Sequence, residues 1–165
     1  MPVPAFIAAL RTHVGHTPLW LIGTTAVVIR DDHVLLVQRA DNSWWTPVTG
    51  IVDPGEEPAD AACREVTEET GVRAEPVRLA WVHTTPLITH VNGDQAQYLD
   101  HTFLMRWVAG EPYPADDEST AARGCALDAL PEMPTHMHRR ITAALGDEDT
   151  TRFEWSRPTG WQRSR

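Results

Sequence analysis

Four glutamates within one short stretch of the sequence have a spacing that suits a metal site. Glu56 is followed by Glu65, Glu68 and Glu69. The last three stand at positions i, i+3 and i+4, so a helix would carry them on one face. Like charges at this spacing repel and lower helix stability, and we therefore expect a cation to bind there. Hard divalent cations such as Mg²⁺ and Mn²⁺ prefer carboxylate oxygens.

The same stretch has the start and stop signals of a helix. Pro58 fits the first turn, where its missing N–H costs nothing. Gly71 fits a left-handed position just beyond the end. Gly50 and Gly55 flank a loop that must turn sharply and let the backbone approach a ligand. The expected inward face follows the helical period and consists of Ala59, Ala62, Cys63, Val66 and Thr70.

Nine positions in this stretch match the pattern of a known family. They are Gly50, Glu56, Arg64, Glu65, Val66, Glu68, Glu69, Gly71 and Val72. This pattern is the Nudix box, so the chain resembles the Nudix family, and the flanking strand pattern extends the likeness to about residues 20–145. The resemblance implies an α/β fold with a mixed β-sheet sandwiched between helices. It also implies hydrolysis of a phosphoanhydride in a nucleoside diphosphate linked to another moiety.

The resemblance implies a role for each carboxylate of the box. Glu68 and Glu69 correspond to the central metal ligands, and the expected cofactor is Mg²⁺ or Mn²⁺. Glu65 corresponds to a further ligand or to the base that deprotonates water. A backbone carbonyl often completes the site in the family, and the matching position here is Thr49.

Four other box residues are expected mainly to shape the site. By resemblance, Arg64 orients a glutamate at the catalytic centre and Glu56 anchors the loop. Gly50 and Gly71 have structural roles. Many family members have Pro-Gly-Gly before the box, whereas this chain has Val48-Thr49-Gly50, so its substrate need not be that of the nucleotide-sanitising members.

The general base is expected from outside the box. Many family members recruit an acidic residue from a later loop, and the candidates here are Asp116, Asp117 and Glu118, of which we select Glu118. The alternative for each is a solvated acidic loop. Asp100 is a further candidate, which by strand alternation would otherwise face solvent.

Three residues are candidates for binding the substrate. Trp44 and Trp45 precede the box and could stack on a base or pterin ring; alternatively, one packs in the core and the other supports the loop. Arg39 could bind a phosphate, or form a surface ion pair. We rank ADP-ribose-like compounds first as substrates, and nucleoside or pterin triphosphates second.

Composition narrows the functional classes. The chain has 165 residues, a net charge of −9, fourteen arginines and no lysine. The acidic balance argues against nonspecific nucleic-acid binding, and the missing lysine excludes P-loop and Schiff-base chemistry.

Two cysteines, Cys63 and Cys125, do not make a disulfide framework. No long apolar run or convincing secretory signal is present, so we expect a cytoplasmic protein that does not bind membranes. His136 and His138 are expected at the surface.

The remaining pattern predicts alternating strands and helices. Helices are expected at 4–13 and 130–145, and strands at 21–30, 33–39, 44–49, 73–84, 97–108 and 121–128. Residues 1–19 form an N-terminal extension, 20–146 the Nudix domain, and 147–165 a mobile polar tail. A homodimer is common in the family, and Trp155 and Trp161 of the tail would suit one.

Two hypotheses from different classes remain. The first is an active, metal-dependent pyrophosphohydrolase. The second is a catalytically silent Nudix domain that binds a nucleotide ligand as a regulatory module. Degenerate members of the second kind usually lose box carboxylates, whereas this chain keeps Glu65, Glu68 and Glu69.

Overall fold

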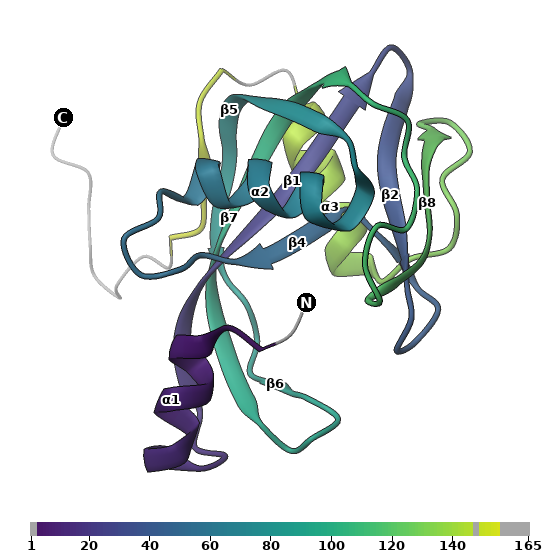
Figure 1. Cartoon of the computed structure of the whole chain (residues 1–165). Coiled ribbons are helices and arrows are strands. Elements are labelled where there is room, and N and C mark those ends of the chain that lie inside the picture. Colours follow the sequence, from purple (N-terminus) through teal and green to yellow (C-terminus); the bar gives the residue numbers. More distant parts are fainter. Residues whose placement is uncertain (1–2, 147–148, 156–165) are drawn as a thin grey trace, which may run out of the picture.

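A mixed β-sheet with a helix on each face forms the body of the protein (Figure 1). The computed structural model describes residues 3–146 and 149–155. The helices are α1 (Ala5–Val14), α2 (Pro58–Thr70) and α3 (Thr135–Leu145). The strands are β1 (Leu19–Arg30), β2 (His33–Arg39), β3 (Trp45–Thr46), β4 (Val48–Ile51), β5 (Arg73–Thr84), β6 (Ile88–Thr89), β7 (Gln95–Ala109), β8 (Ser119–Ala126) and β9 (Arg152–Phe153). The predicted α/β sandwich is therefore confirmed.

Strand β1 separates the two halves of the core. Its side chains alternate between the faces of the sheet. Ala26 and Val28 point to the face covered by α2, whereas Val27 points to the face covered by α3. Both clusters are almost fully buried, so α2 and α3 are held on opposite faces of one sheet.

Strand β1 also aligns the segment that leads into the box. It pairs in parallel with β7 over most of its length and antiparallel with β4 over residues 23–26. In the β1–β4 register, Thr24 lies opposite Gly50 and Thr25 lies opposite Thr49. The first residues of the box are thus positioned by a strand in the centre of the sheet.

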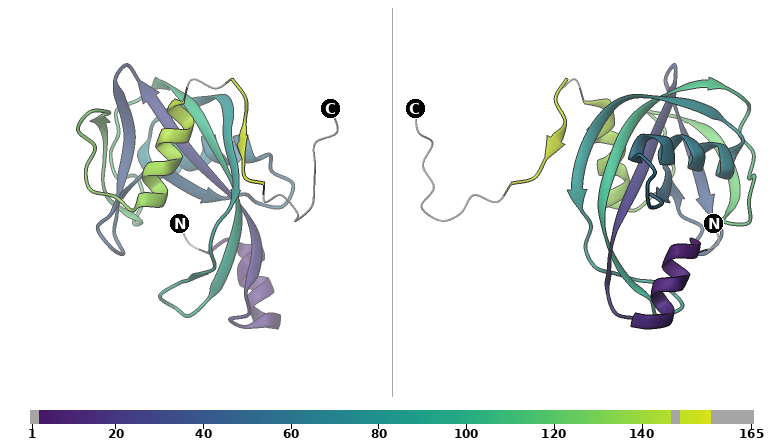
Figure 2. Two further views of the ribbon diagram at one scale, coloured as in Figure 1. Left: turned by 180° about the vertical axis from the view of Figure 1, so that it is seen from behind. Right: turned by 60° about the vertical axis from the view of Figure 1, so that its left-hand side comes forward.

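An arm extends from the body of the protein (Figures 1 and 2). It consists of α1, the first residues of β1, β6 and the first residues of β7. A small core of Ile7, Leu21 and Ala96 holds it together. Trp20, on the opposite face of β1, is 58% exposed.

Most of the predicted helices and strands are found, but two of them have different bounds next to a proline. The strand predicted at 44–49 is divided into β3 and β4 at Pro47, which has no N–H for a sheet ladder. Helix α3 begins at Thr135, directly after Pro134, rather than at 130. Strand β6 was not predicted.

The predicted mobile tail contains a short strand. Within the segment 147–165, β9 pairs in parallel with β5, at Trp81 and Val82. Trp155 is half-exposed, and Trp161 lies outside the described residues. Within the described ranges, no helix is long and apolar enough to cross a membrane.

Candidate active site

Helix α2 carries the box glutamates and is anchored by its apolar side. Pro58 stands in its first turn, and Gly71 adopts the predicted left-handed conformation at its end, with φ of 69°. Ala62 and Val66 are fully buried against the sheet. Cys63, predicted as a core residue, is only partly buried. This packing places Glu65 of the helix against Gly50 of β4.

The three glutamates of α2 lie in different environments. Glu65 is fully buried, Glu69 is 5% exposed, and Glu68 is exposed. Burial raises the pKa of Glu65 to about 7, against the opposing effect of Arg64. Burial raises the pKa of Glu69 to about 8, and the neighbouring Glu65 adds to this. Both carboxylates are therefore costly to ionise unless a cation compensates their charge.

Arg64 joins the acidic residues of the box. Its Nε and Nη2 donate to the two carboxylate oxygens of Glu56, each at 2.9 Å. Its Nη1 donates to Glu65 at 2.8 Å and to Glu68 at 3.2 Å, and Nη2 also reaches the carbonyl of Ile51 at 3.1 Å. The guanidinium lowers the pKa of Glu56. One guanidinium therefore connects Glu56, Glu65 and Glu68, and the orienting role of Arg64 and the anchoring role of Glu56 stay predictions.

Gly50 makes room for the Glu65 carboxylate. A Cβ at position 50 would overlap the side-chain atoms of Glu65. Glu65 Oε2 is buried and has no hydrogen-bond partner among the described residues. The backbone of β4 thus comes into direct contact with one carboxylate of the candidate site, next to Thr49.

The loop after β7 brings further acidic residues to the end of α2. The N–H of Ala115 donates to the carbonyl of Glu69 at 3.0 Å. The charge of Asp116 contributes to the raised pKa of Glu69. Asp116 also accepts a hydrogen bond from the N–H of Glu118 at 3.0 Å. Glu118 is half-buried, and its backbone carbonyl accepts a hydrogen bond from the N–H of Ala40. The third candidate of this loop, Asp117, is exposed. Of the three, Asp116 is the one whose charge raises the pKa of Glu69.

Arg39 lies near the same end of α2. Its guanidinium forms a two-pronged ion pair with Asp41, at 2.9 and 2.8 Å. The pKa of Arg39 is raised, mainly by its hydrogen bond to Asp41 and to a smaller extent by the charge of Glu69. In return, the charge of Arg39 opposes part of the rise in the pKa of Glu69. Both alternatives for Arg39 are thus compatible with its position.

The two adjacent tryptophans differ in their surroundings. Trp45 is half-buried, packs against the core on the α3 face, and has the guanidinium of Arg123 at 4.5 Å from its ring centroid. Trp44 is 37% exposed. Of the two, Trp44 is the more exposed and is therefore the better candidate for stacking on a substrate.

Asp100 lies on the opposite face of the sheet from the box glutamates. It is 3% exposed, so of the two alternatives left open by the sequence, the solvent-facing one is wrong. It accepts hydrogen bonds from Thr25 and Thr102, and Arg140 Nη1 lies 3.4 Å from it. His83 Nδ1 is 3.7 Å away. Sequence reasoning missed this network because its members lie far apart in the chain and follow no local pattern.

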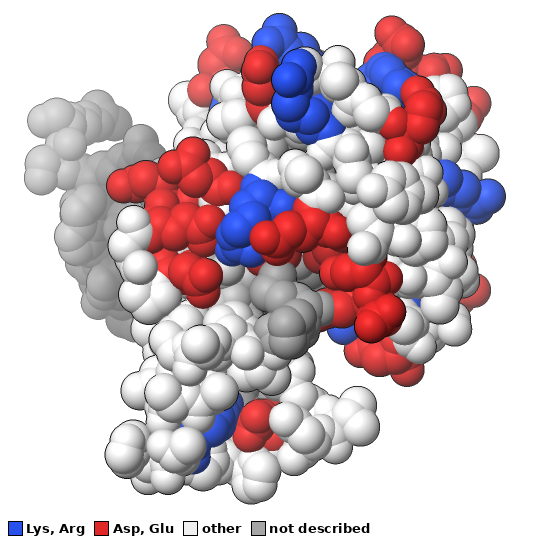
Figure 3. All heavy atoms as spheres, viewed as in Figure 1, with Lys and Arg blue, Asp and Glu red and all other residues white. Residues whose placement is uncertain are grey.

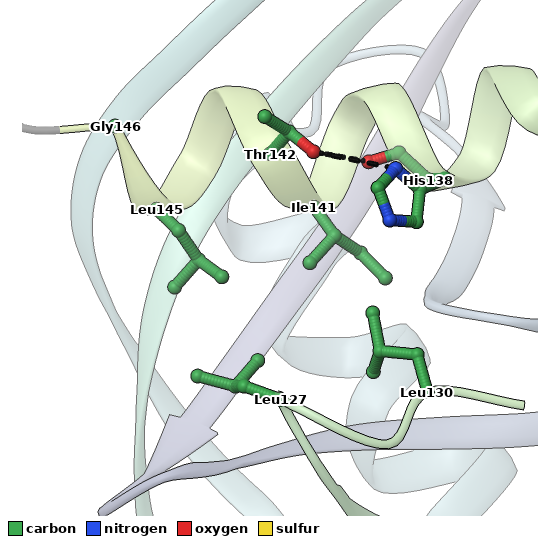
Figure 4. Close-up of a pocket in the computed structure, with 7 residues that line it drawn as sticks. All are labelled: Leu127, Leu130, His138, Ile141, Thr142, Leu145 and Gly146. Atoms are coloured by element: carbon green, nitrogen blue, oxygen red, sulfur yellow. Dashed lines mark hydrogen bonds between the residues drawn. The ribbon is translucent and has the colours of Figure 1, made fainter.

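The hollow beside α3 is separate from the box. An apolar hollow of about 350 Å³ lies beside α3, lined mainly by Leu127, Leu130, Ile141 and Leu145 (Figure 4). His138 also lines it, and His136 is exposed as predicted.

On the α2 side, acidic side chains gather over the helix and its preceding loop around a smaller basic group (Figure 3).

The donor set at α2 fits a divalent cation, although no three acidic, histidine or cysteine side chains of the described residues already form a metal cluster. The unpartnered Glu65 oxygen and the buried Glu69 carboxylate provide hard oxygen ligands. Glu68 instead forms an ion pair with Arg64 at 3.2 Å, and its side chain is 52% exposed. Binding would therefore require a local rearrangement of Glu68.

Comparison with known proteins identifies the family. The family model of the NUDIX domain matches residues 20–145. The chain belongs to the Nudix family. This assignment agrees with the complete box and with the sheet that holds α2 and α3 on its two faces.

Several relatives of this Nudix chain are known. It is 32% identical to the NAD-capped RNA hydrolase NudC of Pseudomonas aeruginosa over 114 residues, which cover 66% of this chain and 37% of that protein. A MutT Nudix hydrolase from Burkholderia pseudomallei has 28% identity and a TM-score of 0.62, covering 76% of this chain and 98% of that one. An ADP-ribose pyrophosphatase from Streptococcus suis has 26% identity and a TM-score of 0.59, covering 81% and 98%.

These relatives support placing the Nudix chain among the hydrolases. The chain spans less than half the length of the curated relatives it matches, since it covers 44% of a MutT-like protein from Streptomyces ambofaciens and 37% of NudC. Its match to the two solved structures extends over nearly their whole length.

Proposed function

We propose that this protein is a metal-dependent pyrophosphohydrolase that cleaves a nucleoside diphosphate linked to another moiety. The observation that carries the proposal is the pair of buried carboxylates on α2. Glu65 and Glu69 are almost inaccessible, and one oxygen of Glu65 has no partner among the described residues. A pair of this kind is hard to explain as a solvated acidic helix, and a bound cation accounts for it.

Glu65, Glu68 and Glu69, with the carbonyl of Thr49, would hold the cation, for which Mg²⁺ or Mn²⁺ suits the oxygen donors. When bound, such an ion polarises phosphoryl oxygens and makes water more acidic. Arg64 fixes the orientation of Glu65 through its 2.8 Å hydrogen bond. Glu65 is thereby oriented before the substrate arrives, and such pre-positioning favours electrostatic stabilisation of the transition state.

The proton of the attacking water needs an acceptor, and the loop at 115–118 offers one. Glu118 remains our selected base, with Asp116 as the alternative because its charge acts on Glu69. Arg39 would bind a phosphate oxygen by exchanging its partner Asp41 for the substrate. Trp44 would stack on the base. Arg39 and Trp44 would thus bind different parts of the substrate, the phosphate and the base.

Two of the relatives are named for compounds that link two larger groups through a pyrophosphate. One is named for NAD-capped RNA and another for ADP-ribose, and both compounds carry a pyrophosphate between two larger groups. We keep ADP-ribose-like compounds first and nucleoside or pterin triphosphates second. The NudC name adds NAD-capped RNA to the compounds to be tested, against our expectation of no nucleic-acid partner. A homodimer and a cytoplasmic location stay predictions.

A substrate panel tests the proposal. ADP-ribose, NADH, NAD-capped RNA, canonical and oxidised nucleoside triphosphates and a diadenosine polyphosphate are incubated with Mg²⁺, with Mn²⁺ or with EDTA, and products are separated by chromatography. We expect one class to be cleaved only with metal, and AMP to be released from ADP-ribose. Glu68→Gln should abolish turnover, whereas Glu57→Gln, an exposed residue before α2, should not. Ligand binding without cleavage of any compound would instead indicate the regulatory module.

A further inference from the structure

The α3 face of the sheet changes from apolar to polar at the level of the box. Val27, Ile141 and Ala144 form the apolar part of this face. Two residues along β1 from Val27, at Thr25, the face instead buries the charged residues Asp100 and Arg140, which are 3% and 5% exposed. The polar level coincides with the residues of β1 that pair with β4.

The polar residues at this level form a connected network. Arg140 Nη1 donates to Thr25 Oγ1 at 2.8 Å, and Thr25 Oγ1 donates to Asp100 Oδ1 at 2.8 Å. Thr102 Oγ1 donates to Asp100 Oδ2 at 2.8 Å. Arg140 Nη1 lies 3.4 Å from Asp100 Oδ1. The hydroxyl of Thr25 is thus both donor and acceptor, which fixes its orientation.

A buried ion pair of this kind is a weak device for stability. Removing two charges from water costs about as much as their attraction returns, and apolar residues of equal volume often stabilise as well or better. The surrounding face is apolar, so Arg140 and Asp100 interrupt a core that could have continued. A role in fixing the position of one strand explains the pair better than a contribution to stability.

The strand residues that the network holds are in contact with both sides of the candidate site. Thr25 lies opposite Thr49 in the β1–β4 register, and Thr24 lies opposite Gly50. On the other face of the sheet, Thr24 Oγ1 donates to the carbonyl of Pro58, in the first turn of α2, at 3.2 Å. Two consecutive threonines of β1 therefore connect α3 to β4 and to the helix that carries the glutamates.

We propose that Arg140 and Asp100 are positioning residues for the metal site. Acting through Thr25, they hold β1 in the register that presents Thr49 and Gly50 to the glutamates of α2. They do not touch the substrate or the cation themselves. This inference rests on the proposed function, because it assumes that the segment at Thr49 and α2 bind a cation together.

Two variants with matched chemistry test the inference. Thr25→Val and Thr102→Val each replace a fully buried hydroxyl that donates to Asp100 with a methyl group. Only Thr25 is paired with Thr49. Mn²⁺ affinity is measured from the signal of free Mn²⁺ in electron paramagnetic resonance, and folding from circular dichroism and thermal unfolding of the full chain.

We expect both variants to unfold at lower temperature but only one to lose metal affinity. Thr25→Val should weaken Mn²⁺ binding about tenfold, which is the loss typical for residues that support metal ligands. Thr102→Val should bind Mn²⁺ as the parent does, and Thr25→Ser, which keeps the hydroxyl, should restore most of the affinity. If Thr25→Val does not fold, Arg140→Met serves as the second test of the same connection.

Equal Mn²⁺ affinity in Thr25→Val, Thr102→Val and the parent would overturn the positioning role, and so would equal weakening in both variants. Glu69→Gln separates this failure from failure of the proposed function. If Glu69→Gln weakens Mn²⁺ binding while Thr25→Val does not, only the positioning role is wrong. If Glu69→Gln binds Mn²⁺ like the parent, the proposed metal site is wrong, and the inference is overturned with it.

Discussion

Gly50 and Glu65 share a space that has no room for a Cβ atom on residue 50. Glu65 is fully buried and its Oε1 is held by Arg64 at 2.8 Å, so it cannot move aside without breaking that contact. The strand before the box and the helix after its loop are therefore fitted to each other at this point. The fit explains in physical terms why the first position of the box is a glycine.

Gly50→Ala should consequently disturb the site more than the fold. Forcing a methyl group into a packed position costs about 1–3 kcal/mol of stability, and we expect a loss of metal affinity of about tenfold or more because Glu65 is displaced. Gly124→Ala is the control, since a Cβ there would make ordinary contacts of 3.6 Å. Calorimetric titration with Mn²⁺ checks both variants. Parent-like affinity in Gly50→Ala would show that Glu65 is not a ligand.

Arg64→Lys should fail although it keeps the positive charge. Arg64 uses all three guanidinium nitrogens at once, to contact Glu56, Glu65, Glu68 and the Ile51 carbonyl. A lysine ammonium cannot span these positions. We expect kcat/KM to fall about 10–100-fold, as measured on the substrate that the panel identifies.

Arg106→Lys provides the comparison for this change. Arg106 forms an exposed ion pair with Glu75 on the surface, and such pairs contribute little. Its kcat/KM should match that of the parent. A similar kcat/KM for Arg64→Lys and Arg106→Lys would contradict the role given to the guanidinium.

The stability of the metal-free protein should fall as pH rises. The pKa of Glu69 is raised from 4.5 to about 8 by burial. Between these values the unfolded chain ionises this group while the folded protein keeps it protonated, so the native state binds more protons and loses stability with pH. The contribution is complete below pH 4.5 and is lost as pH passes through about 8. We expect the melting temperature in EDTA to decline across this window.

Glu69→Gln removes this titration and should flatten the decline. The difference in melting temperature between the parent and the variant isolates the contribution of this group from other titrations. Added Mn²⁺ should raise the melting temperature of the parent more at pH 8 than at pH 6, because binding requires the ionised carboxylate. Parallel curves for the parent and Glu69→Gln would show that Glu69 titrates normally.

The two tryptophans before the box should separate binding from stability. Trp44→Ala should raise KM for a base-containing substrate and lower the stability less than Trp45→Ala does, because Trp44 is 37% exposed. Trp45→Ala should lower the free energy of unfolding by about 2 kcal/mol, because it loses core packing and the contact with Arg123. Steady-state kinetics and chemical denaturation measure the two effects. A raised KM in Trp45→Ala together with a loss of stability in Trp44→Ala would contradict this assignment.

Local patterns in the sequence were sufficient to predict the framework of the site. The start of α2 at Pro58 and its end at Gly71 depend on backbone properties of those residues alone, and both predictions are confirmed. The burial of Glu65 and Glu69 was not predicted, since an acidic helix face is normally solvated. That burial depends on β4 and on the loop at 115–118, which are distant in the sequence.

The buried network on the α3 face was beyond any local pattern. Asp100 bonds to Thr25 across 75 positions, and Arg140 bonds to Thr25 across 115. Strand alternation left open whether Asp100 faced the interior, because both sides of the central strands are covered. The parallel pairing of β1 with β7 brings Thr25 and Asp100 together, and α3 adds Arg140 from above the sheet.

Mn²⁺ binding and turnover measured on the same preparation of Glu69→Gln test the central claim most directly. The variant replaces a carboxylate by an amide of equal size at a buried position, so its circular dichroism spectrum should match that of the parent. We predict that it loses both Mn²⁺ binding and metal-dependent cleavage, while Glu57→Gln keeps both. If Glu69→Gln binds Mn²⁺ and cleaves the substrate as the parent does, the buried carboxylates of α2 are not the metal site.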